Sequence, residues 1–513
     1  MPQALTASPQ AGGAEPNRAR ERAWVLAVAV VLTGLRSATL VGFEGARFDS
    51  DQALIGLMAK HLIEGRAFPV FTYGQPYMLG VEAWLAAPFI WAGGLTVTML
   101  KLPLLFVNVA VSVLLVRLLE REAGLRPALA LVPALFFILV APGTATLLLE
   151  ASGGNVEPFL MVLLLWMVRR RPWTFGALLA FGMLQREFTV YALGGLAVLR
   201  LADRSLLDVR AWRSVIAGAV SFGAVWQGIY LLKQFSSISG PGTSARWAPL
   251  EASANLAAVA GRVCVGVDYA VAGLTALVTS HIANVLGASH EALNAFTINS
   301  AQGQGAAGLW PVLGVAFALM AAAIAWQAAR GRAVLVRPPF EFPAYLLLVG
   351  VQAFLVHALT RCGVLSLAEL RYSLLGVFAA VGLVTLFLQA ATTRTLKAAA
   401  IGVVMLWTVV TAAAHTRFAA EYVFHTPFNA RRALADTLLE QGVRFAYADF
   451  WESYIVSFYT NEQVIVASTS YVFIDEYQWL VERQADEAVH IRREPCPGGT
   501  DVAEWLYICP PGS

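Results

Sequence analysis

Two aspartates, Asp49 and Asp51, are the first candidates for chemistry in this sequence, because they directly follow its first strongly apolar segment. The next apolar residues recur at the spacing of an amphipathic helix that stops at Gly65. A helix N-terminus stabilises an ionised carboxylate, which suits a metal ligand, whereas burial raises a carboxylate pKa, which suits a general base. The Asp-x-Asp spacing also permits Asp49 and Asp51 to bind a divalent cation. Both aspartates are therefore catalytic candidates, with both roles open.

Aromatic, amide and carboxylate side chains follow in the same polar stretch, which ends near residue 84. Gln75, Tyr77 and Glu82 suit sugar binding by stacking and hydrogen bonding, and they equally suit an aromatic belt at a membrane interface. Lys101 stands at the start of the next apolar segment, where an ammonium group can contact a lipid phosphate or extend to the membrane surface. These four residues are candidates for substrate binding.

Later polar loops supply further acids and arginines. Glu157, Arg186, Arg371 and Tyr372 each lie at the end of an apolar segment, and each alone fits a solvated helix end. If the segments cross a membrane alternately, all of them reach the same surface as Asp51. Glu157 is then a further catalytic candidate, and the other three are candidates for substrate binding.

The composition decides what kind of element positions these side chains. The chain has 513 residues, of which 58% are hydrophobic and 13% charged, and its mean hydropathy is +0.64. These values exclude a soluble globular protein and indicate a polytopic α-helical membrane protein. We expect about eleven spans, near residues 24–43, 96–118, 126–143, 157–168, 173–185, 188–202, 214–234, 306–328, 343–360, 373–390 and 397–415.

Arginines cluster in every second loop between these spans, which places those loops and the N-terminus in the cytoplasm. The sequence thus divides into a disordered cytoplasmic tail (1–23), a transmembrane domain (24–415) and an extracytoplasmic C-terminal region (416–513). The outer loops of the transmembrane domain include the polar stretch at 44–95 and a large loop at 236–305. We expect a multi-pass protein of a bacterial inner or plasma membrane.

Residues 416–513 have the composition of a soluble domain, with seven Arg, no Lys and 14 acidic residues. A helix is predicted at 427–441, and alternating helix and strand patterns after it indicate a small α/β domain. Outside the cytoplasm, Cys496 and Cys509 can form a disulfide. The chain lacks Cys-x-x-Cys, phosphate-loop, His-Glu-x-x-His and Gly-x-Ser-x-Gly motifs.

The order and sidedness of these motifs resemble the GT-C superfamily of integral-membrane glycosyltransferases. The likeness is closest to its protein O-mannosyltransferase-like and aminoarabinose-transferase-like members. It rests on the acidic motif after the first span, on a loop of two interfacial helices, and on Lys-Leu-Pro from Lys101. Glu157-Pro158 is similar to the Asp-Pro of the family's second outer loop, and Arg371-Tyr372 to its Arg-Tyr element. The glutamate departs from the family's aspartate and reaches one methylene further.

The resemblance covers roughly residues 24–415 and implies an activity. A sugar would pass from a polyprenyl-phosphate donor to a protein, lipid or glycan acceptor on the outer face, with inversion. Asp51 matches the family's acid/base position best, Asp49 is the second choice, and Arg186 with Arg371 would stabilise the departing lipid phosphate. The resemblance names no certain cofactor beyond a possible divalent cation, and no nucleic acid partner.

Two other classes of protein fit parts of the sequence. A transporter or flippase for lipid-linked sugars would use polar residues within its spans, and Asn108, Gln227 and His357 are the candidates. A membrane-tethered sensor would explain the C-terminal domain but leaves the acidic loop without a purpose. Glycosyl transfer accounts for the acidic loop, leaves the role of the C-terminal domain open, and is the preferred hypothesis.

Overall fold

The computed structural model describes residues 14–237, 266–289, 308–331, 335–360, 367–503 and 505–512. Residues 1–13 of the expected tail, and 238–265 and 290–307 of the expected large outer loop, lie outside this description. Residues 14–23 continue the first apolar segment as helix, so the helix begins earlier than the predicted boundary at residue 24.

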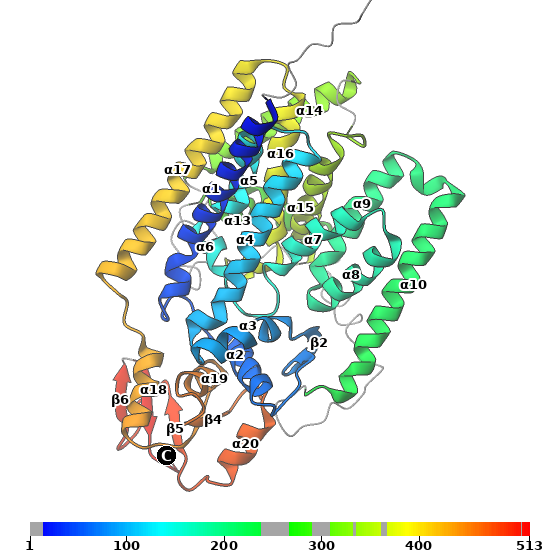
Figure 1. The fold of residues 1–513 in the computed structure, drawn as a ribbon. Helices are drawn as coiled ribbons and strands as arrows, with labels where there is room; N and C mark the ends of the chain where they lie inside the picture. Colours follow the sequence, from blue (N-terminus) through cyan, green and yellow to red (C-terminus); the bar gives the residue numbers. More distant parts are fainter. Residues whose placement is uncertain are drawn as a thin grey trace, which may run out of the picture.

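Apolar helices packed in a bundle make up most of the molecule (Figure 1). They are α1 (Ala14–Gly42), α4 (Val97–Arg121), α5 (Pro127–Ile138), α6 (Pro142–Leu147), α7 (Glu157–Val168), α8 (Pro172–Gln185), α9 (Val190–Ala202), α10 (Val209–Leu232), α12 (Val267–Ala276), α13 (Ile282–Val285), α14 (Trp310–Ala329), α15 (Glu341–Thr360), α16 (Val377–Ala390) and α17 (Arg394–Phe424). Short 3-10 turns are η1 (Glu187–Thr189), η2 (Ser205–Leu207), η3 (Lys233–Phe235), η6 (Leu367–Tyr372) and η7 (Leu374–Gly376), and η4 (Leu277–His281) is a π-helical turn.

Six helices in the described part of the chain are long and apolar enough to cross a membrane: α1, α4, α10, α14, α15 and α17. Every predicted span overlaps a helix, and the chain is a multi-pass membrane protein. The number of eleven crossings stays a prediction, because several helices are short. Helix α5 is one of the short helices. It does not continue into α6, because Pro142 lacks the amide hydrogen that a continuous helix would need there.

The two ends of the bundle differ. Figure 1 shows the N-terminal end of α1 at one end and the C-terminal domain at the other. At the first end, the Arg22 guanidinium donates to the Glu120 carboxylate at 2.7 Å and so joins α1 to the end of α4. At the second end, the chain between α1 and α4 folds over the bundle.

That first loop contains two helices, as predicted, and a hairpin that the sequence analysis missed. Helix α2 (Ser50–Ile63) is followed by β1 (Phe71–Thr72), β2 (Gln75–Leu79) and α3 (Val81–Gly93). The two strands pair antiparallel around Gly74, whose φ of 69° suits a tight turn. Helix α3 exposes Trp91, as expected for a helix at a membrane interface.

Helix α2, which the sequence analysis also expected along the interface, is covered by protein on both sides. Most of its residues are buried, because the C-terminal domain covers the side that faces away from the bundle. The Phe458 ring lies so close to Gly56 that a Cβ there would approach it to 2.3 Å. Phe48 packs on Phe458 and Tyr459 with ring centroids 4.9 and 5.4 Å apart. Glycine at position 56 therefore allows the two domains to touch.

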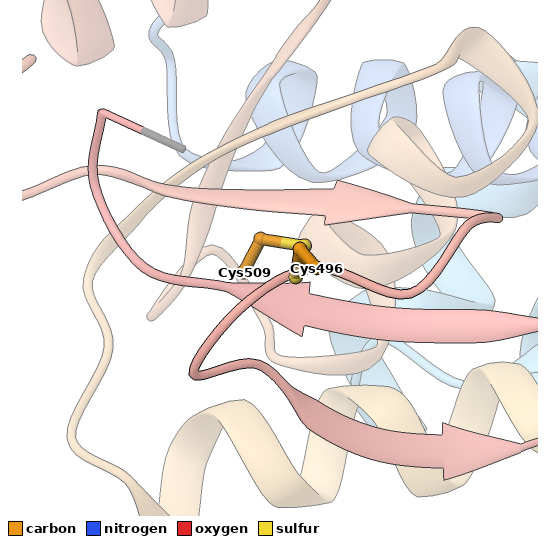
Figure 2. Close-up of a disulfide and its surroundings, with 2 residues drawn as sticks. All are labelled: Cys496 and Cys509. Carbon is orange, nitrogen blue, oxygen red and sulfur yellow. A yellow bond between two sulfur atoms is a disulfide. The ribbon is translucent and has the colours of Figure 1, made fainter.

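The C-terminal domain is the small α/β unit expected from the sequence. Its described residues form a five-stranded sheet in the order β4-β3-β5-β7-β6, with the first three strands parallel and the rest antiparallel. Helices and strands alternate as α18 (Ala430–Glu440), β3 (Phe445–Ala448), α19 (Phe450–Tyr459), β4 (Ile465–Ser468), α20 (Asp475–Glu482), β5 (Val489–Arg492), β6 (Thr500–Ala503) and β7 (Leu506–Cys509). Cys496 and Cys509 form a disulfide beside β7 (Figure 2).

Glu462 joins the C-terminal domain to the first loop. Its carboxylate accepts hydrogen bonds from His61 Nε2 at 3.0 Å, Arg66 Nη1 at 2.9 Å and the Tyr477 hydroxyl at 2.7 Å, and it pairs with Lys60. Burial opposes ionisation of Glu462, but these partners hold its pKa well below the usual range. The carboxylate therefore stays charged and binds the C-terminal end of α2.

We expect Glu462→Gln to weaken this attachment, because one neutral amide replaces an anion that binds several cations. Arg66 and Lys60 can regain water, so the loss is about 2 kcal/mol in the free energy of unfolding. Thermal unfolding of the full-length protein in detergent measures it, with Glu482→Gln on α20 as an exposed control. Because the folded pKa is depressed, the contribution of Glu462 is present above pH 4.5 and is lost as the pH falls. Equal unfolding temperatures for wild type and Glu462→Gln at pH 7 would contradict this role.

Candidate active site at the outer end of the bundle

Asp49 and Asp51 lie at the start of α2 and have different environments. Asp49 is the N-cap: its carboxylate accepts from the backbone amide of Gln52 at 3.2 Å. Asp51 is in the first turn, partly buried, and faces Asp49, Arg371, Glu150 and Arg47. One carboxylate is therefore used to begin the helix, while the other points into a cluster of charges.

Burial and the neighbouring Asp49 raise the pKa of Asp51 to about 6, against the opposing effects of Arg371 and Arg47. The sequence could not decide between the helix N-terminus, which lowers a carboxylate pKa, and burial, which raises it. The effect of burial is larger here, because the C-terminal domain and the loops cover α2. A carboxylate with a pKa near 6 suits general-base chemistry at neutral pH.

Arg47 and Glu150 belong to the same cluster and were not among the predicted site residues. The Arg47 Nε donates to the Glu150 carboxylate at 2.6 Å, and Glu150 is 3% exposed. Burial raises the pKa of Glu150, while Arg47 favours its charged form. Arg371 reaches the cluster from η6 and interacts with both Asp51 and Glu150. The sequence contains one signal for Arg47, which is its position two residues before Asp49.

The sequence analysis expected Lys101 to contact a lipid phosphate or to extend to the membrane surface. The structure shows it in neither role. Its ammonium group is buried and donates to the backbone carbonyls of Leu40, Ala46 and Arg47 at 3.2, 2.8 and 2.7 Å. An ammonium has three hydrogens, so these bonds use all of them. Lys101 therefore fixes the turn between α1 and α2, which carries the charged cluster.

A second polar group surrounds Glu157, the first residue of α7. Glu82 on α3 does not face an open sugar site; its carboxylate accepts from the backbone amides of Gly153 and Gly154 at 2.7 and 2.8 Å. Both glycines have φ above 90°, a conformation that other residues rarely adopt. Burial and the nearby Glu157 raise the pKa of Glu82 well above its usual value. Glu82 thus holds the loop that leads into α7.

Several buried polar atoms in this second group have no hydrogen-bond partner in the described part of the chain. Arg186 lies beside Glu157, and its Nη1 is 3.3 Å from the Met78 sulfur. Gln185 is 1% exposed, and its side-chain amide lies next to Gly154. Buried groups of this kind are rare unless water or a ligand satisfies them. The atoms are Oε1 and Oε2 of Glu157, Oε1 and Nε2 of Gln185, Nε of Arg186 and Oδ1 of Asn155.

A row of cations and aromatic rings connects the two groups. The Arg186 guanidinium lies 5.2 Å from the Phe188 ring centre, and Phe188 contacts Tyr372 edge to face at 6.1 Å. Arg371 completes the row at 5.1 Å from the Tyr372 ring, whose hydroxyl accepts from Arg371 Nη2 at 3.2 Å. The predicted residues Arg186, Arg371 and Tyr372 are therefore brought together, although they lie in distant loops.

Gln75 and Tyr77 lie on strand β2, and Tyr77 is 52% exposed. Beyond Tyr372, a buried pair of histidines extends the row. His281 and His357 have ring centres 4.7 Å apart, and His281 Nε2 is 2.7 Å from the Ser373 hydroxyl.

Two of the three polar residues expected of a transporter, Asn108 and His357, are buried by packing. Asn108 accepts from the buried Arg36 and donates to the carbonyls of Leu104 and Leu148 at 2.8 and 2.9 Å. His357 is buried against His281, and Gln227 lies exposed on α10. Asn108 therefore joins α1 to α4 and to the segment after α6.

A cavity of 520 Å³ opens between the first loop and the C-terminal domain, close to Asp49. Its size is within the range of small-molecule sites. Phe428 is 72% exposed, and the buried Arg431 Nε has no hydrogen-bond partner within the described residues. The walls include Glu44, Phe48, Phe428, Arg431, Tyr459 and Trp505.

The carboxylates near Asp51 do not form an evident metal site. Asp49 is used as a helix cap, and Glu150 is bound to Arg47. Across the described ranges, no three His, Cys, Asp or Glu side chains come together as metal ligands. The part of the chain that the structure describes therefore shows no metal site at Asp49 and Asp51, and the divalent cation stays a prediction.

Comparison with solved structures places this arrangement in a known fold. The oligosaccharyltransferase of Archaeoglobus fulgidus, in complex with Zn and sulfate, superposes with a TM-score of 0.50 at 14% identity, over 91% of this chain and 68% of the other. The chain shares the fold of that enzyme. The apo form of that enzyme gives a TM-score of 0.48 at 15% identity, and its complex with an inhibitory peptide and a dolichol-phosphate gives 0.47 at 15%, each over 92% of this chain and 69% of the other. No known family model and no curated protein sequence matches the chain.

Proposed function

We propose that this protein transfers a sugar from a polyprenyl-phosphate-linked donor to an acceptor on the extracytoplasmic face, with inversion of the anomeric centre. The observation that carries the proposal is Asp51: a partly buried carboxylate with a pKa of about 6, next to Arg371, at the outer end of a GT-C fold. A carboxylate whose pKa lies near neutral pH can act as a general base, and the cation beside it can bind a phosphate leaving group.

In the proposed step, Asp51 accepts the proton of the acceptor hydroxyl or amine. The acceptor atom attacks the anomeric carbon, and the bond from that carbon to the lipid phosphate oxygen breaks with its electron pair on the oxygen. Arg371 and Arg186 stabilise the phosphate through charge-assisted hydrogen bonds. A single displacement of this kind inverts the anomeric centre.

The second polar group supports binding of the donor sugar. Glu157, Gln185 and Arg186 each have buried side-chain donor or acceptor atoms without a hydrogen-bond partner among the described residues. Sugar hydroxyls both donate and accept, so they can satisfy all of these atoms at once. In this proposal Glu157 positions the sugar rather than acting on the proton, because its pair with Glu82 lies apart from Asp51.

The acceptor would enter from the aqueous side. The cavity between the first loop and the C-terminal domain begins at Phe48, which directly precedes Asp49. Its exposed aromatic rings and its arginine suit a peptide or a glycan. One solved structure of the archaeal oligosaccharyltransferase contains an inhibitory peptide and a dolichol-phosphate, which supports a polymeric acceptor and a lipid-linked donor here.

The proposed topology has the N-terminus in the cytoplasm of a bacterial cell and the C-terminal domain outside. Arg22 near the start of α1 pairs with Glu120 near the end of α4, and Arg169 pairs with Glu122, so arginines lie at this end in agreement with the positive-inside rule. The Cys496–Cys509 disulfide supports an oxidising compartment for the opposite end.

Reconstitution tests the activity. Purified protein in liposomes would receive a mixture of polyprenyl-phosphate sugars with candidate peptide and glycan acceptors, and release of the lipid phosphate would be followed. We expect release that depends on the acceptor and a glycosylated product. Movement of the donor between leaflets without a product would instead support the transporter, and protein without either activity would contradict both.

A further inference from the structure

Arg47 lies among carboxylates of the kind that bind a divalent cation. It pairs with Glu150 at 2.6 Å through Nε and also interacts with Asp49 and Asp51. Oxygen atoms from carboxylates are the ligands that Mg²⁺ and Mn²⁺ prefer. In this protein a guanidinium, whose charge is permanent, is placed among them.

The backbone holds Arg47 in this place at an energetic cost. Its φ is 56°, in the left-handed region that residues other than glycine seldom adopt. Such a conformation is strained and persists where the surroundings impose it, often at functional sites. The surroundings here are Lys101 and Gln52, which donate to the Arg47 carbonyl at 2.7 and 3.2 Å.

The charges around Arg47 balance without a metal. Asp49, Asp51 and Glu150 supply the negative groups, and Arg47 and Arg371 lie against them. Lys101 approaches from the bundle side and interacts with Glu150 and Asp49. The guanidinium of Arg47 contacts Oε1 of Glu150, so a divalent cation would have to displace Arg47 before it could use that oxygen.

We infer that Arg47 occupies the position of a divalent cation in the outer site, so that the site works with a built-in positive charge and without a metal. This inference rests on the proposed function only for its consequence in catalysis. The geometric part stands on the Arg47–Glu150 pair and the strained backbone. It is an alternative to the expectation that Asp49 and Asp51 bind a cation.

Removal of the guanidinium should therefore create a metal site. In Arg47→Ala, three carboxylates would face one another across the space that the side chain left, which favours a hard cation. Arg47→Lys keeps a positive charge at the same place and should stay metal-free. Arg432→Ala removes an arginine on α18 that pairs with Asp436 and serves as the matched control.

Binding of Mn²⁺ to the full-length protein in detergent, after removal of metals with a chelator, gives a readout that does not depend on activity. We expect Arg47→Ala to gain a single Mn²⁺ site, which a further Glu150→Gln change abolishes. Wild type, Arg47→Lys and Arg432→Ala should bind none at the same Mn²⁺ concentration. Size-exclusion chromatography and thermal unfolding establish that each variant is folded.

Two outcomes would overturn the inference. One is a Mn²⁺ site in the wild type that is lost in Asp51→Asn. The other is a folded Arg47→Ala variant, and a folded Arg47→Gln variant beside it, without any gain of Mn²⁺. Turnover provides a second arm: wild-type activity should be unchanged by a chelator, and activity that needs added Mg²⁺ would also overturn the inference. If no transferase activity is found, the proposed function fails while the Mn²⁺ measurement still decides the role of Arg47.

Discussion

Replacing Asp51 with asparagine is expected to lower turnover by about 10²–10⁴-fold, the usual contribution of a positioned general base. The amide keeps the size of the side chain but cannot accept the acceptor's proton. Release of lipid phosphate by the reconstituted protein measures the effect. Asp49→Asn is the matched control and should lose far less, because Asp49 caps α2 and an asparagine can also cap a helix. Equal turnover in wild type and Asp51→Asn would remove Asp51 from the mechanism.

The pH dependence gives the same prediction a second test. Wild-type turnover should rise with pH through a midpoint of about 6, as Asp51 loses its proton, and the variant should lack this rise.

Asp51→Asn should lower turnover but raise the free energy of unfolding. The folded pKa of Asp51 is raised above the ordinary value of 3.8, so its ionisation costs folding free energy, increasingly as the pH rises from about 4 to 6. Asp51→Asn should therefore be more stable than wild type at pH 7, by about 1–3 kcal/mol, and lost activity cannot be attributed to unfolding.

Arg371→Gln is expected to lower turnover by about 10²–10³-fold, the usual cost of removing one group that stabilises developing negative charge. The loss should appear in the rate constant at saturating donor, because the phosphate gains charge as the sugar departs. Arg371 also favours the charged form of Asp51. The midpoint of the pH profile should therefore move above 6 in the variant.

Arg371→Lys is the informative comparison, since it retains the charge but not the forked geometry of the guanidinium. Partial recovery of turnover with a midpoint near 6 is expected. A raised KM for the donor with an unchanged rate constant at saturation would contradict the proposed role, because it would show that Arg371 acts in binding alone. An unshifted pH midpoint in Arg371→Gln would show that Arg371 does not influence the ionisation of Asp51.

Sequence reasoning succeeded where the signal is local. Hydrophobic runs of about the thickness of a bilayer predicted every span that the structure shows as helix, because a helix in lipid must be apolar along its length. The sequence also predicted that Asp51 lies at the start of a helix after the first span, and the structure has Asp51 in the first turn of α2. The catalytic roles of Asp51, Arg186 and Arg371 stay predictions.

Other features depended on contacts between distant parts of the chain. The sequence shows α2 as an amphipathic helix but cannot show that α19, some 400 residues later, covers its other side. That cover decides the pKa of Asp51, since burial rather than the helix N-terminus dominates. The predicted role of Lys101 failed for the same reason: its three acceptors are backbone carbonyls, which carry no mark in the sequence.

The sequence by itself therefore determined the helical membrane architecture, the α/β character of the C-terminal domain and the residue types at the outer site. Periodicity and composition follow from short-range physics, and both can be read along the chain. Only the tertiary structure decided which of those residues meet. It brought Arg47 to Glu150 and Arg371 to Asp51, and it separated Glu82 and Glu157 into a second group. Coulomb interactions and burial act through space, and for that reason the chemistry of Asp51 is set by neighbours up to 320 positions away.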